Sequence, residues 1–445
     1  MKVLLVGHAC SPRRGSELAF TWNWAWHLSQ IHQVWVLTHP QERQYIETYL
    51  AEHPNPNLNF IWVNLPHWLD TWNPATDKRV SPLHYVLWQR AALHRARLLH
   101  SQVGFDIAHH VSWGTISEPP LLWRLPIPFI WGPVGGGQIS PPAFRPYLGA
   151  AARAEWLRDL RIRLIRFRPI LKKAARRSAM IFATNHETAT MLKQAGASDV
   201  KLFLDTGIRE DFLPKEFPHR APSTRTGFLW VGRFLPRKCL PLAIEALAQL
   251  REVPVRLVVA GKGGMRNRWQ ELAATSGISN QIDFLGEVPY SQMPELYRSA
   301  DAFIFTSIRD AFGSQVLEAM AAGLPIIALD HQGVGAFVPE NAGIKVPVTT
   351  PRETVARLGH AIRMIAGSAE LRNRMGRAAW NFARAHTWQH RVEQMSRFYE
   401  VAVNWNRKML CAGSESGQEK ACAPGLGSAT TGNGKGSPYE IPYKS

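Results

Sequence analysis

Residues 309–330, RDAFGSQVLEAMAAGLPIIALD, combine a turn, a helix and a strand in one short stretch. Gly313 falls in the turn, a helix-forming segment follows it, and the apolar run LPIIALD is typical of a buried strand. Asp310 and Glu318 stand eight residues apart, so one carboxylate precedes the helix and the other lies two turns inside it. A helix N-terminus suits a diphosphate, and a carboxylate accepts hydrogen bonds from sugar hydroxyls. The spacing fits a solvated acidic face equally well.

Strands and helices alternate outward from this stretch in both directions. In the first half the predicted strands are KVLLVG (2–7), QVWVLTH (33–39), FIWVNL (60–65), DIAHHV (106–111), PFIWGPV (128–134) and AMIFAT (179–184). After a polar, Pro-rich stretch they are GFLWVGRF (227–234), VRLVVAG (255–261), IDFLG (282–286), DAFIFTS (301–307), PIIALD (325–330) and IKVPV (344–348). The alternation predicts two doubly wound α/β domains with a ligand cleft at the carboxyl ends of their sheets.

The composition is that of a globular protein of two or three domains. The chain has 445 residues, 45% hydrophobic and 19% charged, and four scattered cysteines that form no disulfide framework or metal motif. The histidines show no metal-binding spacing, so the sequence predicts no metal and no cofactor. No apolar run is long enough to span a membrane and no secretory signal is evident, so we expect a cytoplasmic protein or one peripheral to the inner face of the membrane.

Positive charge is concentrated in one segment. The net charge is +18, and residues 145–177 alone contain 11 Lys and Arg against 2 Asp and Glu. Within residues 153–177, Leu157, Leu160, Leu164, Phe167 and Leu171 recur at helical spacing, with an interruption near Pro169. Such a helix lies either on an anionic membrane or against the core with a solvated basic face. Nucleic-acid binding lacks a recognisable reading motif here, and we expect none.

Two loops of the second half carry candidate anion-binding groups. GRFLPRK (232–238) places Arg233 and Lys238 at the end of a strand, where two cations suit a diphosphate or simply keep the surface soluble. VVAGKGG (258–264) places Gly261 directly after another strand, where it allows close approach to a ligand or an ordinary tight turn.

Three loops of the first half end predicted strands in the same way. SPRRGSE (11–17) contains Gly15, with Ser16 as the expected cap of the following helix. FDIAHHVSWG (105–114) ends a strand at His109 and His110, of which one is expected to face the cleft because side chains alternate along a strand. FIWGPVGGGQISPP (129–142) carries three glycines that permit either close approach to a ligand or a sharp turn.

In this order and spacing, GRFLPRK, AGKGG, FLGEVPYSQMPELYRSADAFIFTS and DAFGSQVLEAMAAGLPIIA resemble the nucleotide-binding domain of the retaining family 4 glycosyltransferases of GT-B fold. The resemblance covers residues 226–400, and HTWQHRVEQMSRFYE (386–400) resembles the closing helix of that family. It implies two Rossmann-like domains facing an interdomain cleft. The expected divisions are residues 1–207 for the acceptor, 208–387 for the nucleotide sugar, 388–410 for a helix crossing back, and 411–445 for a disordered tail.

The resemblance also implies roles for individual residues. Arg233 and Lys238 would hold the donor diphosphate, Glu318 would bind the ribose, and a histidine at position 109 or 110 would face the donor sugar. The backbone of Phe312, Gly313, Ser314 and Gln315 would meet the sugar or the phosphates. Gly15 stands where the family has a glycine pair, and Asp310 stands where it usually has glutamate. Since aspartate is one methylene shorter, its carboxylate would lie about 1 Å farther from a sugar hydroxyl.

The sequence therefore predicts a retaining, metal-independent hexosyltransferase that uses a nucleotide diphosphate sugar as donor. The expected acceptor is a glycan or glycolipid hydroxyl, with a possible anionic membrane surface bound through residues 153–177. The alternative is a GT-B protein that binds sugar nucleotides but is impaired in transfer, because Asp310 and the single Gly15 depart from the family pattern.

Overall fold

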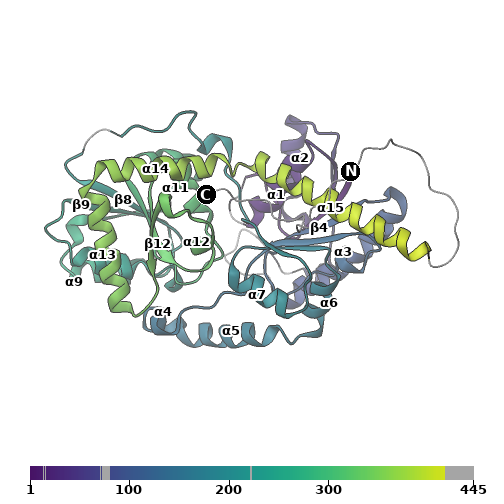
Figure 1. The fold of residues 1–445 in the computed structure, drawn as a ribbon, viewed down its shortest axis with the longest axis horizontal. Helices are drawn as coiled ribbons and strands as arrows, with labels where there is room; N and C mark the ends of the chain where they lie inside the picture. Colours follow the sequence, from purple (N-terminus) through teal and green to yellow (C-terminus); the bar gives the residue numbers. More distant parts are fainter. Residues whose placement is uncertain (14, 16, 71, 73–80, 221–222, 416–445) are drawn as a thin grey trace, which may run out of the picture. The chain divides into compact units, whose positions relative to one another are not determined.

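The computed structural model describes residues 1–13, 15, 17–70, 72, 81–220 and 223–415. Residues 1–404 form one compact unit that contains two parallel sheets (Figure 1). The first sheet has the order β3-β2-β1-β4-β5-β6-β7 and the second has the order β10-β9-β8-β11-β12-β13. Both orders step outward from a central strand in two directions, which is the doubly wound arrangement that the sequence predicts.

The strands coincide closely with the predicted apolar runs. The first sheet comprises β1 (Lys2–Gly7), β2 (Gln33–Thr38), β3 (Leu58–Trp62), β4 (Ile107–Ser112), β5 (Phe129–Val134), β6 (Met180–Ala183) and β7 (Val200–Leu202). The second comprises β8 (Thr226–Val231), β9 (Val255–Ala260), β10 (Ile282–Gly286), β11 (Ala302–Phe305), β12 (Ile326–Asp330) and β13 (Gly343–Pro347). The sequence analysis missed β7, whose three residues are too few to show a periodicity.

Helices cover both faces of each sheet. Those of the first half are α1 (Glu17–Leu28), α2 (Arg43–Glu52), α3 (Pro82–Val103), α4 (Arg145–Leu148), α5 (Ala152–Ile165), α6 (Pro169–Arg177) and α7 (His186–Gln194). Those of the second half are α8 (Pro241–Ala248), α9 (Arg266–Thr275), α10 (Met293–Arg298), α11 (Ser314–Ala321), α12 (Gln332–Phe337), α13 (Pro351–Gly367) and α14 (Ala369–Arg384), followed by α15 (Trp388–Glu415). None of the described helices is long and apolar enough to cross a bilayer.

Side chains that alternate along β1 enter two different cores. Leu4 and Val6 pack with α3 and α6, whereas Val3 and Leu5 pack with α1 and with the first part of α15. Burial on both faces explains why the strands read as continuous apolar runs. The same two-sided burial fixes the carboxyl ends of the strands, where the loops with candidate functional residues begin.

The final helix α15 continues farther than predicted. Val392, Met395 and Tyr399 are buried, whereas Val401 is exposed because two residues turn a helix by about 200° away from Tyr399. Residues 411–415 lie in the helix and not in a tail, and the remainder of the predicted tail, 416–445, lies outside the described residues.

The basic segment consists of two helices, as the proline predicted. α5 ends at Ile165 and α6 begins at Pro169, where the missing N–H costs no helical hydrogen bond. Of the two alternatives for the leucine stripe, the core-facing one does not hold along α5. Ile162 and Ile165 face the core, whereas Leu157, Leu160, Leu164 and Phe167 are between 41 and 59% exposed.

Candidate active site

The loop between β11 and α11 places a helix N-terminus at the carboxyl edge of the second sheet. Gly313 has φ +100°, a conformation that favours glycine, and as the N-cap residue it has no side chain to cap the first turn of α11. Backbone N–H groups around Ser314 are therefore available to an anion. Phe312 is fully buried and packs on Phe337, so its side chain belongs to the core and only its backbone is near the site.

Glu318 lies one turn farther along α11 and accepts two tyrosine hydroxyls. Tyr297 donates to its Oε2 at 2.7 Å and Tyr290 donates to its Oε1 at 3.3 Å. Burial raises the pKa of Glu318, and the two hydroxyl donors act in the opposite direction. Sequence reasoning missed Tyr290 and Tyr297, although both stand in the segment FLGEVPYSQMPELYRSAD that carried the resemblance.

Lys238 and Asp310 form a direct ion pair next to this helix. Arg237 Nη1 lies 3.7 Å from the same carboxylate, and the Ser307 hydroxyl donates to it at 3.3 Å. Burial alone would raise the pKa of Asp310, but Lys238 and Arg237 outweigh it and lower that pKa to about 2. Lys238 and Arg237 thus stabilise the ionised form of the Asp310 carboxylate, and its expected greater distance from a sugar hydroxyl stays a prediction. Arg233 is exposed, and its charge contributes to lowering the pKa of Lys238 after burial and Arg237.

A cavity of about 440 Å³ opens beside Glu318, and both halves of the chain line it. From the second half come Tyr290, Ser314, Leu317 and Glu318. From the first half and its connection come Ser11, Arg13, Gly15, Asn23 and residues 206–211, with Trp388 from α15. Of the predicted site residues, the structure brings Gly15, Ser314 and Glu318 together around this cavity. Ser16, the predicted helix cap, lies outside the described residues.

Loops of the two halves also contact each other behind the cavity. Arg309, which precedes Asp310, pairs with Glu155 of α5, and the Ser140 hydroxyl donates to the same carboxylate at 2.8 Å. Gln332 Nε2 donates to the carbonyl of Ile139 at 3.0 Å. Ile139 and Ser140, which make these contacts, directly follow the glycine-rich loop 135–137.

The three N–H groups of the glycine-rich loop 135–137 are themselves used within the first half, where they donate to Gly114, Gln138 and Thr188.

The two histidines at the end of β4 lie inside the first half and do not line the cavity. His109 is buried, where its Nε2–H donates to the Gly132 carbonyl at 2.5 Å and its Nδ1 accepts the Tyr399 hydroxyl at 2.6 Å. The Tyr85 hydroxyl lies 2.9 Å from His110 Nε2. The structure thus gives both side chains buried protein partners. The expected contact of one of them with a donor sugar stays a prediction.

Gly261 also has a structural role, since it allows two backbone segments to approach closely. Its φ is +142°, and a Cβ atom there would stand 1.9 Å from the Gly232 carbonyl oxygen, so no larger residue fits. Its N–H donates to Gly286 at 2.7 Å. The glycine therefore serves the close approach of two strand ends, and its predicted role toward a ligand remains a prediction.

Two acidic residues near the site were missed by sequence reasoning. Burial, and then the neighbouring Asp205 carboxylate, raises the pKa of Glu17 to about 7, against a hydrogen bond from the Gly114 backbone. Burial, and then the charge of Asp310, raises the pKa of Asp205 to about 6. Glu17 Oε2 has no hydrogen-bond partner among the described residues. Glu17, Asp205 and Asp310 are far apart in the sequence and interact only in the folded chain, so no local sequence pattern could predict this acidic group.

This raised pKa predicts a stability that declines with rising pH. The folded chain keeps the Glu17 proton to about pH 7, whereas an unfolded glutamate releases it near 4.5. The stabilisation is therefore complete below pH 4.5 and is lost as the pH rises through 7. We expect the contribution of Glu17 to the free energy of unfolding to fall by about 1–2 kcal/mol over this window, a figure reduced from the full pKa shift because the side chain is only half-buried. Buried histidines such as His109, whose pKa burial lowers to about 4, contribute in the opposite direction, so the Glu17 contribution is measured as a difference between variants.

Denaturant titrations of the wild type and Glu17→Gln at pH 5 and pH 8 measure the effect. From pH 5 to pH 8 the free energy of unfolding of the wild type should fall by about 1–2 kcal/mol relative to that of Glu17→Gln, and that of the exposed control Glu52→Gln should change as the wild type does. The same pH dependence in wild type and Glu17→Gln would show that Glu17 does not contribute to it.

Comparison with known proteins agrees with this geometry. Residues 212–382 match the family model described as glycosyl transferases group 1. The D-inositol 3-phosphate glycosyltransferase of Nocardia farcinica (strain IFM 10152) is 32% identical over 199 residues, which are 42% of this chain and 43% of that protein. The match thus spans less than half the length of this curated relative.

Solved structures share the fold at low sequence identity. Sucrose-phosphate synthase from Thermosynechococcus elongatus superposes with a TM-score of 0.62 at 17% identity, covering 92% of this chain and 99% of that one. Anabaena HepE, in complex with UDP, has a TM-score of 0.59 at 16% identity, covering 90% and 100%. Residues 212–382 are thus similar to the glycosyl transferases group 1, and the chain has a two-domain α/β fold of GT-B type.

Proposed function

We propose that this protein is a retaining glycosyltransferase that moves a hexose from a nucleoside diphosphate to an acceptor hydroxyl. The observation that carries the proposal is the cavity at Glu318, in which a half-buried carboxylate, the N-terminus of α11 and Gly15 of the other half converge. The family match over residues 212–382 supports a nucleotide-sugar donor. The neighbour HepE has been solved with UDP, which makes a uridine nucleotide the first donor to test.

Each predicted residue has a chemical task in this proposal. Glu318 accepts the ribose hydroxyls, and the N–H groups at the start of α11 meet the phosphates or the sugar. Lys238 and Arg233 stabilise the negative charge on the departing diphosphate, so the proposal does not call on a metal ion for that task. Asp310 holds Lys238 in place through their ion pair. A front-side displacement, in which the acceptor attacks from the face that the diphosphate leaves, would retain the anomeric configuration.

Thermal unfolding with a panel of nucleotides tests the donor assignment. A ligand at 100 times its dissociation constant stabilises the folded protein by about 2.7 kcal/mol. We expect at least one nucleoside diphosphate and its sugar conjugate to raise the midpoint, and the free nucleoside to have a weaker effect. A panel that leaves the midpoint unchanged throughout would contradict the proposed donor site.

For the acceptor we propose a lipid-linked or polysaccharide hydroxyl reached at the inner face of the membrane. The support is the outer face of α5, on which Leu157, Leu160 and Leu164 are exposed, together with the exposed Phe167 directly after the helix. Exposed arginines stand among them at positions 153, 161, 163, 166 and 168. An exposed apolar face bordered by cations suits an anionic bilayer, where each basic side chain contributes about 1 kcal/mol.

We expect the variant Leu157→Ser/Leu160→Ser/Leu164→Ser to lose at least about tenfold in binding to phosphatidylserine-containing vesicles, because its apolar face is removed. Flotation of the full chain measures the bound fraction. The matched control is Leu285→Ser, an exposed leucine of β10 in the second half, which should float like the wild type. Equal flotation of the triple variant and the wild type would show that α5 is not the membrane contact.

A further inference from the structure

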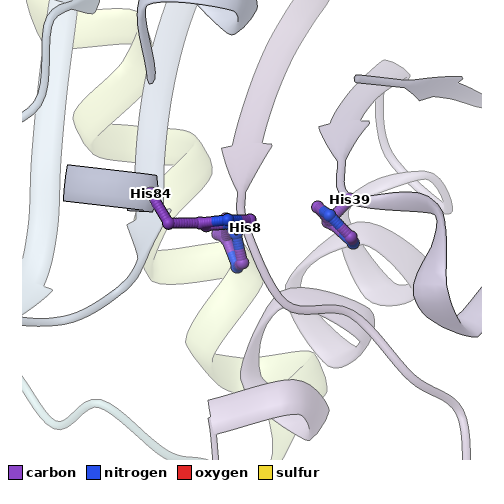
Figure 2. Close-up of side chains that lie close together, drawn as sticks. All are labelled: His8, His39 and His84. Carbon is purple, nitrogen blue, oxygen red and sulfur yellow. Dashed lines mark hydrogen bonds between the residues drawn. The ribbon is translucent and has the colours of Figure 1, made fainter. Parts of the chain in front are cut away.

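Three buried histidines that are far apart in sequence meet at the carboxyl edge of the first sheet. His8 directly follows β1, His39 directly follows β2, and His84 stands in the first turns of α3. All three side chains are buried, and one ring nitrogen of each lies within 4.8 Å of the others. Figure 2 shows the ring of His84 meeting that of His8, with His39 on the other side of His8.

The hydrogen bond of His84 Nδ1 determines which ring nitrogen of this histidine has the free lone pair. Its Nδ1 lies 3.1 Å from the Leu69 carbonyl, which accepts only, so Nδ1 carries the proton and Nε2 has the lone pair. That Nε2 lies 3.2 Å from His8 Nε2. Two imidazole nitrogens bound to one tetrahedral zinc ion at 2.0–2.1 Å are about 3.3 Å apart. The pair is therefore already spaced like two ligands of one ion.

His39 has the carboxylate partner that a metal-bound imidazole commonly uses. Asp70 Oδ1 lies 2.9 Å and Oδ2 lies 3.1 Å from His39 Nε2. A proton on Nε2 leaves the lone pair on Nδ1, which accepts the Gln41 backbone N–H at 3.3 Å, a hydrogen bond that a bound ion would replace. A carboxylate behind a ligating histidine orients the ring and raises its basicity.

The surroundings of His8 are aromatic and exclude water. Its ring contacts those of Trp72, Trp88, Trp113 and Tyr85 at centroid distances of 4.6 to 5.7 Å. His8 Nδ1 is buried without a hydrogen-bond partner among the described residues. An ion bound at Nε2 would leave the ring proton on Nδ1, where no described protein group opposes that tautomer.

We propose that His8, His39 and His84 bind one divalent transition-metal ion, with zinc as the ion that three imidazoles favour. The ion ties the ends of β1 and β2 to α3 and so braces the loop that continues from His8 to Ser11 and Gly15 at the cavity. Binding requires a shift of His39 toward the His8–His84 pair. The sequence predicted no metal because the three histidines are 31 and 45 residues apart, a spacing that belongs to no metal motif.

Metal content of the full chain, purified without a histidine tag, tests the site. After dialysis against zinc and then against metal-free buffer, we expect about one zinc per chain by elemental analysis. Cobalt in its place should give the visible absorption of a tetrahedral complex. His84→Gln should lose both, whereas the control His360→Gln, an exposed histidine of α13, should keep them.

A conservative variant keeps the test decisive if His84→Gln does not fold. Asp70→Asn retains all three proposed ligands and should bind zinc about 10- to 100-fold more weakly, which is the usual effect of losing a carboxylate behind a ligand. Wild-type protein that holds no stoichiometric zinc overturns the proposal. Zinc held with equal affinity by wild type, Asp70→Asn and His84→Gln also overturns it and marks an adventitious ion.

Discussion

Lys238→Gln is expected to lower donor turnover by at least about 100-fold. Lys238 is a buried cation close to the start of α11 through its ion pair with Asp310, and in the proposed reaction it would stabilise the charge of the departing diphosphate. Removal of one preorganised donor to a developing charge commonly costs 10²–10³ in rate, or about 2.7–4 kcal/mol. The measurement is the release of nucleoside diphosphate from the nucleotide sugar that stabilises the protein most. The affinity for the free nucleoside should stay unchanged.

A second variant separates catalysis from folding. Lys238→Gln leaves the Asp310 carboxylate half-buried without its direct ion-pair partner, and breaking such a pair from one side costs up to about 3–5 kcal/mol. Lys238→Gln/Asp310→Asn removes both charges, so it should recover most of the lost stability while turnover stays low. Wild-type turnover in the double variant would remove Lys238 from the proposed chemistry.

Glu318→Gln is expected to weaken the binding of uridine diphosphate, or of the nucleoside diphosphate that binds best, by about 10- to 100-fold. A hydrogen bond to a charged group contributes about 1.5–3 kcal/mol, and the ribose would lose this one. Glutamine keeps an oxygen that can accept the Tyr297 hydroxyl, so the variant should fold normally. Calorimetric titration measures the affinity.

The ribose assignment has its own control. The wild type should bind the 2′,3′-dideoxy analogue much more weakly than the ribonucleotide, whereas Glu318→Gln should distinguish the two poorly, because the acceptor that recognises the hydroxyls is gone. The exposed Glu295→Gln of α10 should behave like the wild type. Equal discrimination by wild type and Glu318→Gln would place the ribose elsewhere.

The strands could be predicted because both faces of each sheet are buried. Two-sided burial selects continuous apolar runs such as KVLLVG, and β1 spans those same residues, Lys2–Gly7. The short edge strand β7 and the last residues of α15 were not predicted, since neither shows a periodic pattern of apolar residues. The apolar residues of α5 could not decide between a core-facing and a membrane-facing helix, because helical spacing shows that a helix has an apolar face but not whether the protein core covers that face.

The candidate site was predictable where its residues stand in one segment of the chain. Glu318, Ser314 and Gly313 belong to one loop and helix, and the structure places them at the edge of the cavity or just before it. The interaction of Glu17 with Asp205 and the meeting of His8 with His84 join residues many positions apart. Such contacts depend on strand order and on helix placement, which local patterns do not encode. At His109 a local pattern, a histidine at the end of a strand, pointed to a ligand contact, but in the structure the two ring nitrogens form hydrogen bonds with Tyr399 and Gly132.

The most direct test of glycosyl transfer at this site is a turnover measurement on the full chain with a panel of nucleotide sugars and glycolipid or glycan acceptors. Release of nucleoside diphosphate is followed with time, and the anomeric configuration of the product is read by nuclear magnetic resonance. We predict release from at least one donor, retention of configuration, and loss of both signals in Lys238→Gln. Nucleotide binding without turnover across the whole panel would contradict transfer and identify a protein that only binds sugar nucleotides.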